Sequence, residues 1–312
     1  MYTIGVDLGG TNIKAALVDE QGGILQEASR PTNLPRPAQA VCDDIADLCR
    51  QLMAGHTVAG VGIGCPGTVD DTDGMVLYSN NLDWSNFAMG SYLKERLGLP
   101  VRLANDANAA ALGEALAGCA KGADSAVILT LGTGVGGGVV LGGKLLTGYT
   151  GAAAEPGHMV VNDAPDAPLC TCGRRGCLEA YASATALIRM TKDAMAAHPE
   201  SALWKLADLD TVTGRTAFDG RDAGDAAAAA VVAEYTHWLA VGIANLVNIF
   251  FPQVVGLSGG VANQGEALLA PLRAQVEPMV FGSAFARKKT TLTTCTLGYR
   301  AGVIGAGLLA QR

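Results

Sequence analysis

Residues 2–18 read YTIGVDLGGTNIKAALV, an apolar stretch that runs into two glycines and leaves as a second apolar stretch. Short apolar runs separated by glycine predict two strands joined by a tight turn. The pattern returns at residues 125–148, SAVILTLGTGVGGGVVLGGKLLTG, which read as strand, glycine turn, strand, turn and strand. Two halves that begin in this way predict a duplicated α/β unit with a cleft between its copies.

The length of 312 residues favours two domains, because a single core stops growing at about 250–300 residues. We predict an N-terminal α/β domain over residues 1–117 plus 299–312, to which the last helix returns, and a C-terminal α/β domain over residues 118–298. Hydrophobic periodicity predicts helices at about 38–54, 87–98, 225–250, 264–280 and 299–311. Polar composition predicts loops around residues 80–81 and over residues 208–225.

The composition is 49% hydrophobic and 16% charged, which is typical of a well-packed soluble protein. The net charge of −7 argues against a nucleic-acid partner, since nucleic-acid binding usually needs a basic face. Residues 1–10 lack the charged and apolar segments of a secretory signal, and the longest apolar run, residues 240–250, is too short for a membrane span. We therefore expect a cytoplasmic protein without a membrane partner.

Two glycine-rich loops, residues 7–14 (DLGGTNIK) and 131–138 (LGTGVGGG), have the composition of phosphate-binding loops. The second contains G-x-G-x-x-G over residues 132–137, but a dinucleotide-binding loop opens a helix, and this one runs into a strand pattern. Both loops read as hairpins whose backbone N–H groups reach an anion, with Thr11 and Thr133 adding hydroxyl donors. The alternative is that both are ordinary hairpin turns.

Asp7 ends the first strand beside these glycines, where its carboxylate would repel phosphate unless a divalent cation lay between them. Mg²⁺ suits this arrangement, because it binds through one carboxylate or its waters together with phosphate oxygens. A third glycine pair, Gly259 and Gly260, lies between a predicted strand and a predicted helix. It either faces the adenosine part of a nucleotide or forms a plain strand–helix turn.

Asn105 and Asp106 lie where a strand ends and an alanine-rich helix begins. Asn and Asp are the leading N-cap residues, so one of them can cap the helix while the other faces a substrate. If phosphoryl is transferred to a hydroxyl, an aspartate at this position suits the base that accepts the hydroxyl proton.

Residues 170–179, CTCGRRGCLE, place three cysteines within eight positions. The spacing lacks the C-x-x-C of a redox pair, and a disulfide would leave an odd thiol. One histidine nitrogen and three sulfurs are typical of structural tetrahedral zinc. The expected ligands are His158, Cys170, Cys172 and Cys177.

A closed zinc site would fix the chain around Glu155, His158 and Glu179. The second ring nitrogen of His158 could then bond to a substrate hydroxyl. The remaining cysteines stand apart among apolar neighbours, and each is expected to be a small buried hydrophobe: Cys42, Cys49, Cys65, Cys119 and Cys295.

Six segments taken together, in this order, resemble the ROK family of sugar kinases within the actin-like ATPase superfamily. They are IGVDLGGTNIKAALVD, GIGCPGTVD, NDANAAALGE, LGTGVGGGVV, EPGHMV and CTCGRRGCLEAYAS, and they span nearly the whole chain. The resemblance implies an actin-like ATPase (ribonuclease H-like) fold, with two α/β domains flanking a cleft that holds ATP and a hexose. It further implies a glucokinase-like enzyme that uses ATP and Mg²⁺ to phosphorylate the 6-hydroxyl of glucose.

Carried over to this chain, the resemblance implies that Asp106 is the catalytic base. Sugar-hydroxyl ligands would be Asn105, Glu155, His158 and Glu179, with Gly67 near the sugar ring. The first phosphate loop would use Gly9, Gly10, Thr11 and Lys14, the second Thr133 and Gly134, and the adenosine contacts would be Gly259 and Gly260. One departure stands at Pro156, since the family more often reads G-E-I-G-H where this chain reads AEPGH, and the fine sugar preference depends on this segment.

Other functions remain open at this point. Within enzymes, the same chemistry would serve a kinase for N-acetylmannosamine, N-acetylglucosamine, fructose or allose. A sugar-responsive repressor would carry a DNA-binding motif ahead of the kinase-like part, whereas the first strand here begins at Tyr2. A nicotinamide oxidoreductase needs a helix after residues 132–137. We also expect a homo-oligomer, a dimer or a tetramer, which the sequence does not distinguish.

Overall fold

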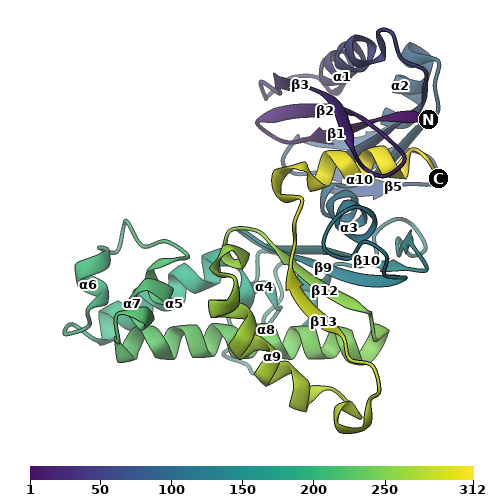
Figure 1. Ribbon diagram of the computed structural model, residues 1–312. Helices are drawn as coiled ribbons and strands as arrows, with labels where there is room; N and C mark the ends of the chain where they lie inside the picture. The colour runs from purple at the N-terminus through teal and green to yellow at the C-terminus, as the bar shows by residue number, and fades with distance from the viewer. The chain divides into compact units, whose positions relative to one another are not determined.

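The computed structural model describes residues 1–312, which divide into two units (Figure 1). Unit 1 comprises Met1–Ile128, Gly138–Ala154 and Cys295–Arg312, and unit 2 comprises Leu129–Gly137 and Glu155–Thr294. The domains expected from the sequence differ from this division, chiefly because residues 118–128 and 138–154 group with unit 1. The predicted domain bounds remain a prediction.

The first sheet has the strand order β3-β2-β1-β4-β8. Strand β2 pairs antiparallel with both β1 and β3, and β4 pairs in parallel with both β1 and β8. Helices α1 and α2 pack together on one side of unit 1, while α10 packs on β1, β4 and α3 (Figure 1). The bounds are β1 Tyr2–Leu8, β2 Asn12–Val18, β3 Ile24–Pro31, β4 Val58–Cys65, β8 Val101–Asn105, α1 Ala38–Met53, α2 Met89–Leu97, α3 Asp106–Leu116 and α10 Ala301–Leu309.

Glycines let α10 lie directly against its neighbours. A Cβ on Gly5 of β1 would stand 1.8 Å from the carbonyl oxygen of Val303, and one on Gly62 of β4 would stand 1.8 Å from that of Ala306. Gly305 approaches α3 as closely, since its Cβ would lie 1.7 Å from the Ala109 carbonyl oxygen. The small residues of the C-terminal helix are therefore a packing requirement, because backbone meets backbone on two faces.

Residues 80–81 lie in a turn, as expected, but this turn joins two strands of a small antiparallel sheet that the sequence did not predict. Its strands are β5 Thr68–Asp70, β6 Met75–Ser79 and β7 Trp84–Phe87. Trp84 and Val76 are buried in the core of unit 1. Long-range burial of these few apolar side chains outweighs the polar local composition.

The second sheet has the order β11-β10-β9-β12-β13, with an antiparallel pair at one side and a parallel pair at the other. The first sheet has the same plan, which confirms the predicted duplication. The bounds are β9 Ser125–Leu131, β10 Val135–Leu141, β11 Lys144–Leu145, β12 Val254–Ser258 and β13 Thr291–Thr294.

Helices of unit 2 gather around α8, the long green helix of Figure 1. By length and composition α8 could span a membrane, but half of its most apolar window is buried inside the protein, and Tyr235 at its middle is fully buried. The expected surface loop at residues 208–225 is wrong over α7, Thr216–Asp222, which buries the side chain of Phe218. The bounds are α4 Glu179–Ala182, α5 Ala184–Ala197, α6 Leu203–Leu206, α7 Thr216–Asp222, α8 Ala226–Phe250 and α9 Glu266–Met279, with 3₁₀ turns η1 Pro156–His158, η2 Val261–Gln264, η3 Ser283–Phe285 and η4 Gly298–Arg300.

Candidate active site

Polar side chains of unit 1 collect at one edge of the first sheet. The strands β1, β4 and β8 are parallel, and their register pairs Asp7 with Gly64 and Cys65 with Asn105. The carboxyl ends of the three strands therefore meet, and this edge is where parallel α/β sheets usually bind ligands. Asp106 opens α3 from the same edge.

Asn105 is the N-cap of α3. Its Oδ1 accepts the backbone N–H groups of Ala107 at 2.9 Å and Asn108 at 3.2 Å, and its Nδ2 donates to the carbonyl oxygen of Gly67 at 3.0 Å. Gly67 has a φ of 102°, and a Cβ there would lie 2.2 Å from the Tyr78 carbonyl oxygen, so only glycine fits. With Asn105 used as the cap, the Asp106 carboxylate is not needed to start the helix.

Asp106 and Asp7 form a half-buried pair of carboxyl groups. Burial raises the pKa of Asp106, and hydrogen bonds from backbone N–H groups and Asn105 partly oppose this. Burial also raises the pKa of Asp7, the positive charge of Lys14 lowers it, and the negative charge of Asp106 raises it again. Because the two carboxylates disfavour each other's ionisation, a cation beside Asp7 would relieve both.

Hydrogen bonds fix the first glycine loop at Gly9, and the tip of the loop is exposed. The Gly9 N–H donates to the Asn12 carbonyl at 2.9 Å, while Thr32 Oγ1 donates to the Gly9 carbonyl at 2.7 Å. Gly10 and Thr11 are exposed. Lys14 is half-buried on β2, where its Nζ lies 5.6 Å from the centre of the Tyr299 ring, and it lines a pocket of about 290 Å³ that does not include the loop glycines.

In unit 2 the four predicted zinc ligands come together. The ligand atoms of His158, Cys170, Cys172 and Cys177 all lie within 4.8 Å of one another. Cys172 and Cys177 have their Sγ atoms 3.6 Å apart, and Cys170 Sγ lies 3.7 Å from His158 Nδ1. Zinc–sulfur bonds of about 2.3 Å give tetrahedral edges of about 3.8 Å, so the four side chains fit a zinc ion.

The backbone between the sulfurs follows from two glycines. Gly173 and Gly176 have φ values of 86° and 75°, the left-handed region that glycine adopts without strain. The backbone N–H of Arg174 lowers the pKa of Cys172 to about 6, which favours the thiolate that a metal requires. Burial raises the pKa of Cys177 to about 12, and a divalent cation would reverse that shift.

Glu179 joins this cysteine loop to the second glycine loop. Its Oε1 accepts the Thr171 hydroxyl at 2.6 Å, and its Oε2 accepts the Val135 N–H at 3.1 Å. A Cβ on Gly134 would lie 2.3 Å from Oε2, so glycine is required for this approach. Thr171 was not among the predicted site residues, although its hydroxyl lies between two predicted zinc ligands in the sequence.

Pro156 fits its position without strain, because it is the first residue of the turn η1 and needs no backbone donor there. The His158 N–H donates to the Glu155 carbonyl at 3.1 Å. Gly157 packs on β10, where a Cβ would stand 1.9 Å from the Val135 carbonyl oxygen. Glu155 is exposed at the start of this turn.

The remaining predicted nucleotide contacts of unit 2 are close neighbours in the second sheet. Thr133 lies exposed in the β9–β10 hairpin, and its carbonyl accepts the Thr185 hydroxyl at 2.8 Å. Gly259 follows β12 with a φ of 88°, and a Cβ there would lie 2.4 Å from the Leu131 carbonyl oxygen. Gly260 is exposed beside it, so the glycine pair borders the end of β9 and the second glycine loop.

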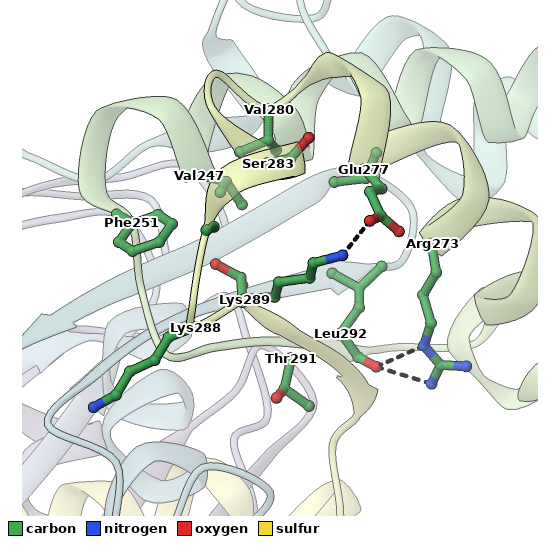
Figure 2. A pocket seen from close by; sticks show the side chains of 13 residues that line it. Val247, Phe251, Arg273, Glu277, Val280, Ser283, Lys288, Lys289, Thr291 and Leu292 are labelled. Carbon is green, nitrogen blue, oxygen red and sulfur yellow. Dashed lines mark hydrogen bonds and ion pairs between the residues drawn. The ribbon is translucent and has the colours of Figure 1, made fainter.

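Unit 2 also carries a pocket of about 310 Å³ that contains none of the predicted site residues. Figure 2 shows its apolar wall, with Val247 and Leu292, and two basic side chains that are held by protein groups. Lys289 pairs with Glu277, and Arg273 donates to the Leu292 carbonyl oxygen. This pocket is separate from the candidate site.

Three of the five scattered cysteines are buried, as expected: Cys42, Cys49 and Cys65. The expectation is wrong for Cys119 and Cys295, which are half-buried and contact each other. Because the two residues are far apart in the sequence, no local pattern indicates this contact.

Comparison with known proteins places these features in one family. The family model described as "ROK family" matches residues 3–312. The chain belongs to the ROK family. The glucokinase of Thermotoga maritima is 40% identical over 310 residues, which cover 99% of this chain and 96% of the relative. The glucokinase of Streptomyces coelicolor is 38% identical over 313 residues, with 99% and 97% covered.

Among solved structures, a ROK family glucokinase from Streptomyces griseus in complex with glucose and AMPPNP is 39% identical to this ROK chain. The match covers 100% of this chain and 99% of that one, with a TM-score of 0.78. The resemblance to ROK sugar kinases and the predicted actin-like α/β fold are confirmed.

Proposed function

We propose that this ROK protein is a glucokinase that transfers the terminal phosphoryl group of ATP to the 6-hydroxyl of glucose. The observation that carries the proposal is the start of α3, where Asn105 caps the helix and leaves the Asp106 carboxylate available beside Asp7. Support comes from full-length relatives that are named glucokinases and from a similar structure that holds glucose and an ATP analogue.

Asp106 serves as the general base. Its carboxylate accepts the proton of the sugar hydroxyl as that oxygen attacks phosphorus. Burial raises its pKa, which makes it a stronger proton acceptor than an ordinary surface aspartate. The hydrogen bond from Asn105 Nδ2 to Gly67 fixes the backbone on the sugar side of this group.

The two glycine loops bind the phosphates of ATP through backbone N–H groups. Gly10 and Thr11 are exposed for this role in the first loop, and Thr133 is exposed in the second. Gly259 and Gly260 contact the adenosine. Mg²⁺ bound near Asp7 would neutralise phosphate charge. It would also stabilise the ionised form of Asp7, whose pKa is raised.

The ligands of the sugar hydroxyls are Asn105, Glu155, His158 and Glu179, and Gly67 lies near the sugar ring. His158 Nδ1 and the three cysteines would hold a zinc ion with a structural role, since four protein ligands would leave no open position. The Nε2 atom of His158 then remains available for a sugar hydroxyl, and Glu179 receives its orientation from Thr171.

Kinases for N-acetylmannosamine, N-acetylglucosamine, fructose or allose are the alternatives, and a repressor is not favoured by the full-length glucokinase relatives. We infer that the enzyme is cytoplasmic and homo-oligomeric, without a nucleic-acid or membrane partner. An assay of ADP release across these sugars, glucose and mannose tests the proposal. The highest kcat/KM is expected for glucose, and a higher value for another sugar would replace glucose as the substrate.

A further inference from the structure

Two cysteines that are 176 positions apart in the sequence meet in unit 1. Cys119 lies in the loop after α3, and Cys295 directly follows β13. Their Sγ atoms are 3.8 Å apart, which is van der Waals contact. Both side chains are half-buried, so a small solute can reach them more easily than it reaches the three fully buried cysteines of the same unit.

One buried carboxylate fixes the backbone on both sides of this contact. Glu114 is 1% exposed, and its Oε2 accepts the N–H groups of Cys119 at 3.0 Å and Thr296 at 3.1 Å. Its Oε1 accepts the Leu297 N–H at 2.7 Å. A Cβ on Gly118 would stand 2.0 Å from Oε2, so the loop after α3 lies directly on the Glu114 carboxylate. The meeting of the sulfurs is thus anchored by a charged hydrogen-bond network.

We propose that Cys119 and Cys295 are an oxidation site that forms an intramolecular disulfide with a peroxide as oxidant. One thiolate attacks the peroxide, so that an S–O bond forms, the O–O bond breaks and water leaves after protonation. The second thiol then attacks the sulfenic sulfur, an S–S bond forms, and a second water leaves. In total two thiols are oxidised and one hydrogen peroxide is reduced to two waters.

The proposed disulfide bond would change the covalent connection between unit 2 and the rest of the chain. All residues of unit 2, Leu129–Gly137 and Glu155–Thr294, lie between the two cysteines in the sequence, whereas both cysteines belong to unit 1. The disulfide therefore closes a covalent loop that contains the whole of unit 2. The unfolded oxidised chain is expected to be more compact than the reduced chain, because a long loop is closed.

The test treats the full-length, metal-loaded protein with hydrogen peroxide, alkylates the remaining thiols under denaturing conditions and digests with trypsin. Cleavage after Lys and Arg places Cys119 in the peptide 103–121 and Cys295 in the peptide 290–300. The expected product is these two peptides joined, two hydrogen atoms lighter than their sum, and separated by dithiothreitol. Migration on a non-reducing denaturing gel should increase in parallel.

The matched controls are Cys119→Ser and Cys295→Ser, each of which should lose the joined peptide and the gel shift. Circular dichroism spectra check that both variants are folded. Recovery of both peptides in alkylated or sulfinic form, while other cysteines oxidise, would overturn the proposal, as would a link to Cys170, Cys172 or Cys177. Since ligand atoms of Glu114 and both cysteines lie within 4.8 Å of one another, protection that a chelator removes would also overturn it in favour of a metal site.

Discussion

Replacing Asp106 with Asn removes the proton acceptor while keeping the shape of the side chain. Because Asn105 caps α3, and the amide oxygen of Asn can still accept the Ala107 N–H that Asp106 accepts at 2.9 Å, the helix start should survive. Loss of a general base costs about 10²–10⁴-fold in kcat, or about 3–5 kcal/mol of transition-state stabilisation. ADP release at saturating glucose and ATP measures the change.

The same substitution has a definite effect on stability. Burial raises the pKa of Asp106 in the folded chain, so the folded state binds protons more readily than the unfolded state. The stability from this group is fully present below the unfolded pKa and is lost as pH rises through the folded pKa. At neutral pH the buried charge is therefore destabilising, and Asp106→Asn should raise Tm relative to the wild-type protein.

Glu95→Gln, a charge change at an exposed position on α2, is the matched control and should alter neither kcat nor Tm measurably. In the wild-type enzyme, kcat/KM should fall in acid with a midpoint above the usual range of aspartate, because the base must be ionised to act. An Asp106→Asn enzyme that retains more than a tenth of wild-type kcat would refute the assignment of the base.

Three further outcomes are expected. Metal analysis should find about one zinc per chain, and stripping it should raise the KM for glucose more than the KM for ATP, whereas an active metal-free protein would exclude the zinc site. Thr171→Val should raise the KM for glucose by about 5–10-fold with little change in Tm, because one hydrogen bond to the Glu179 carboxylate is lost; an unchanged KM would separate Thr171 from sugar binding. Gly62→Ala should destabilise unit 1 by about 1–3 kcal/mol, since its Cβ would meet the Ala306 carbonyl oxygen at 1.8 Å, and an unchanged urea midpoint would contradict the packing described for α10.

The parts of the fold that sequence reasoning predicted correctly depend on local patterns. The helices α1, α8 and α10 follow from apolar periodicity and helix-ending residues within one segment, and their observed ends lie within a few residues of the expected ones. The small sheet β5–β7 was missed because Trp84 and Val76 acquire their apolar surroundings only from distant residues. Helix α7 was missed for the same reason, since Phe218 is the one large side chain on its buried face.

In the candidate site, the zinc ligands were predictable because three of the four lie within eight positions. The environment of Glu179 was not predictable, because its partner Val135 is 44 positions away in the sequence and offers only a backbone N–H. No side-chain pattern records such a contact. The pairing of Cys119 with Cys295 is hidden in the same way, because only the folded chain brings the ends of α3 and β13 together.

The position of α10 has a consequence for synthesis of the chain. Residues 301–309 complete a layer on β1 and β4, yet they leave the ribosome after every residue of unit 2. Unit 2 can therefore assemble first, while the apolar side chains of Ala16 and Val18 on β2, which α10 later covers, are still open to water. During that interval a chaperone would bind the first half of the chain, although that half is synthesised first.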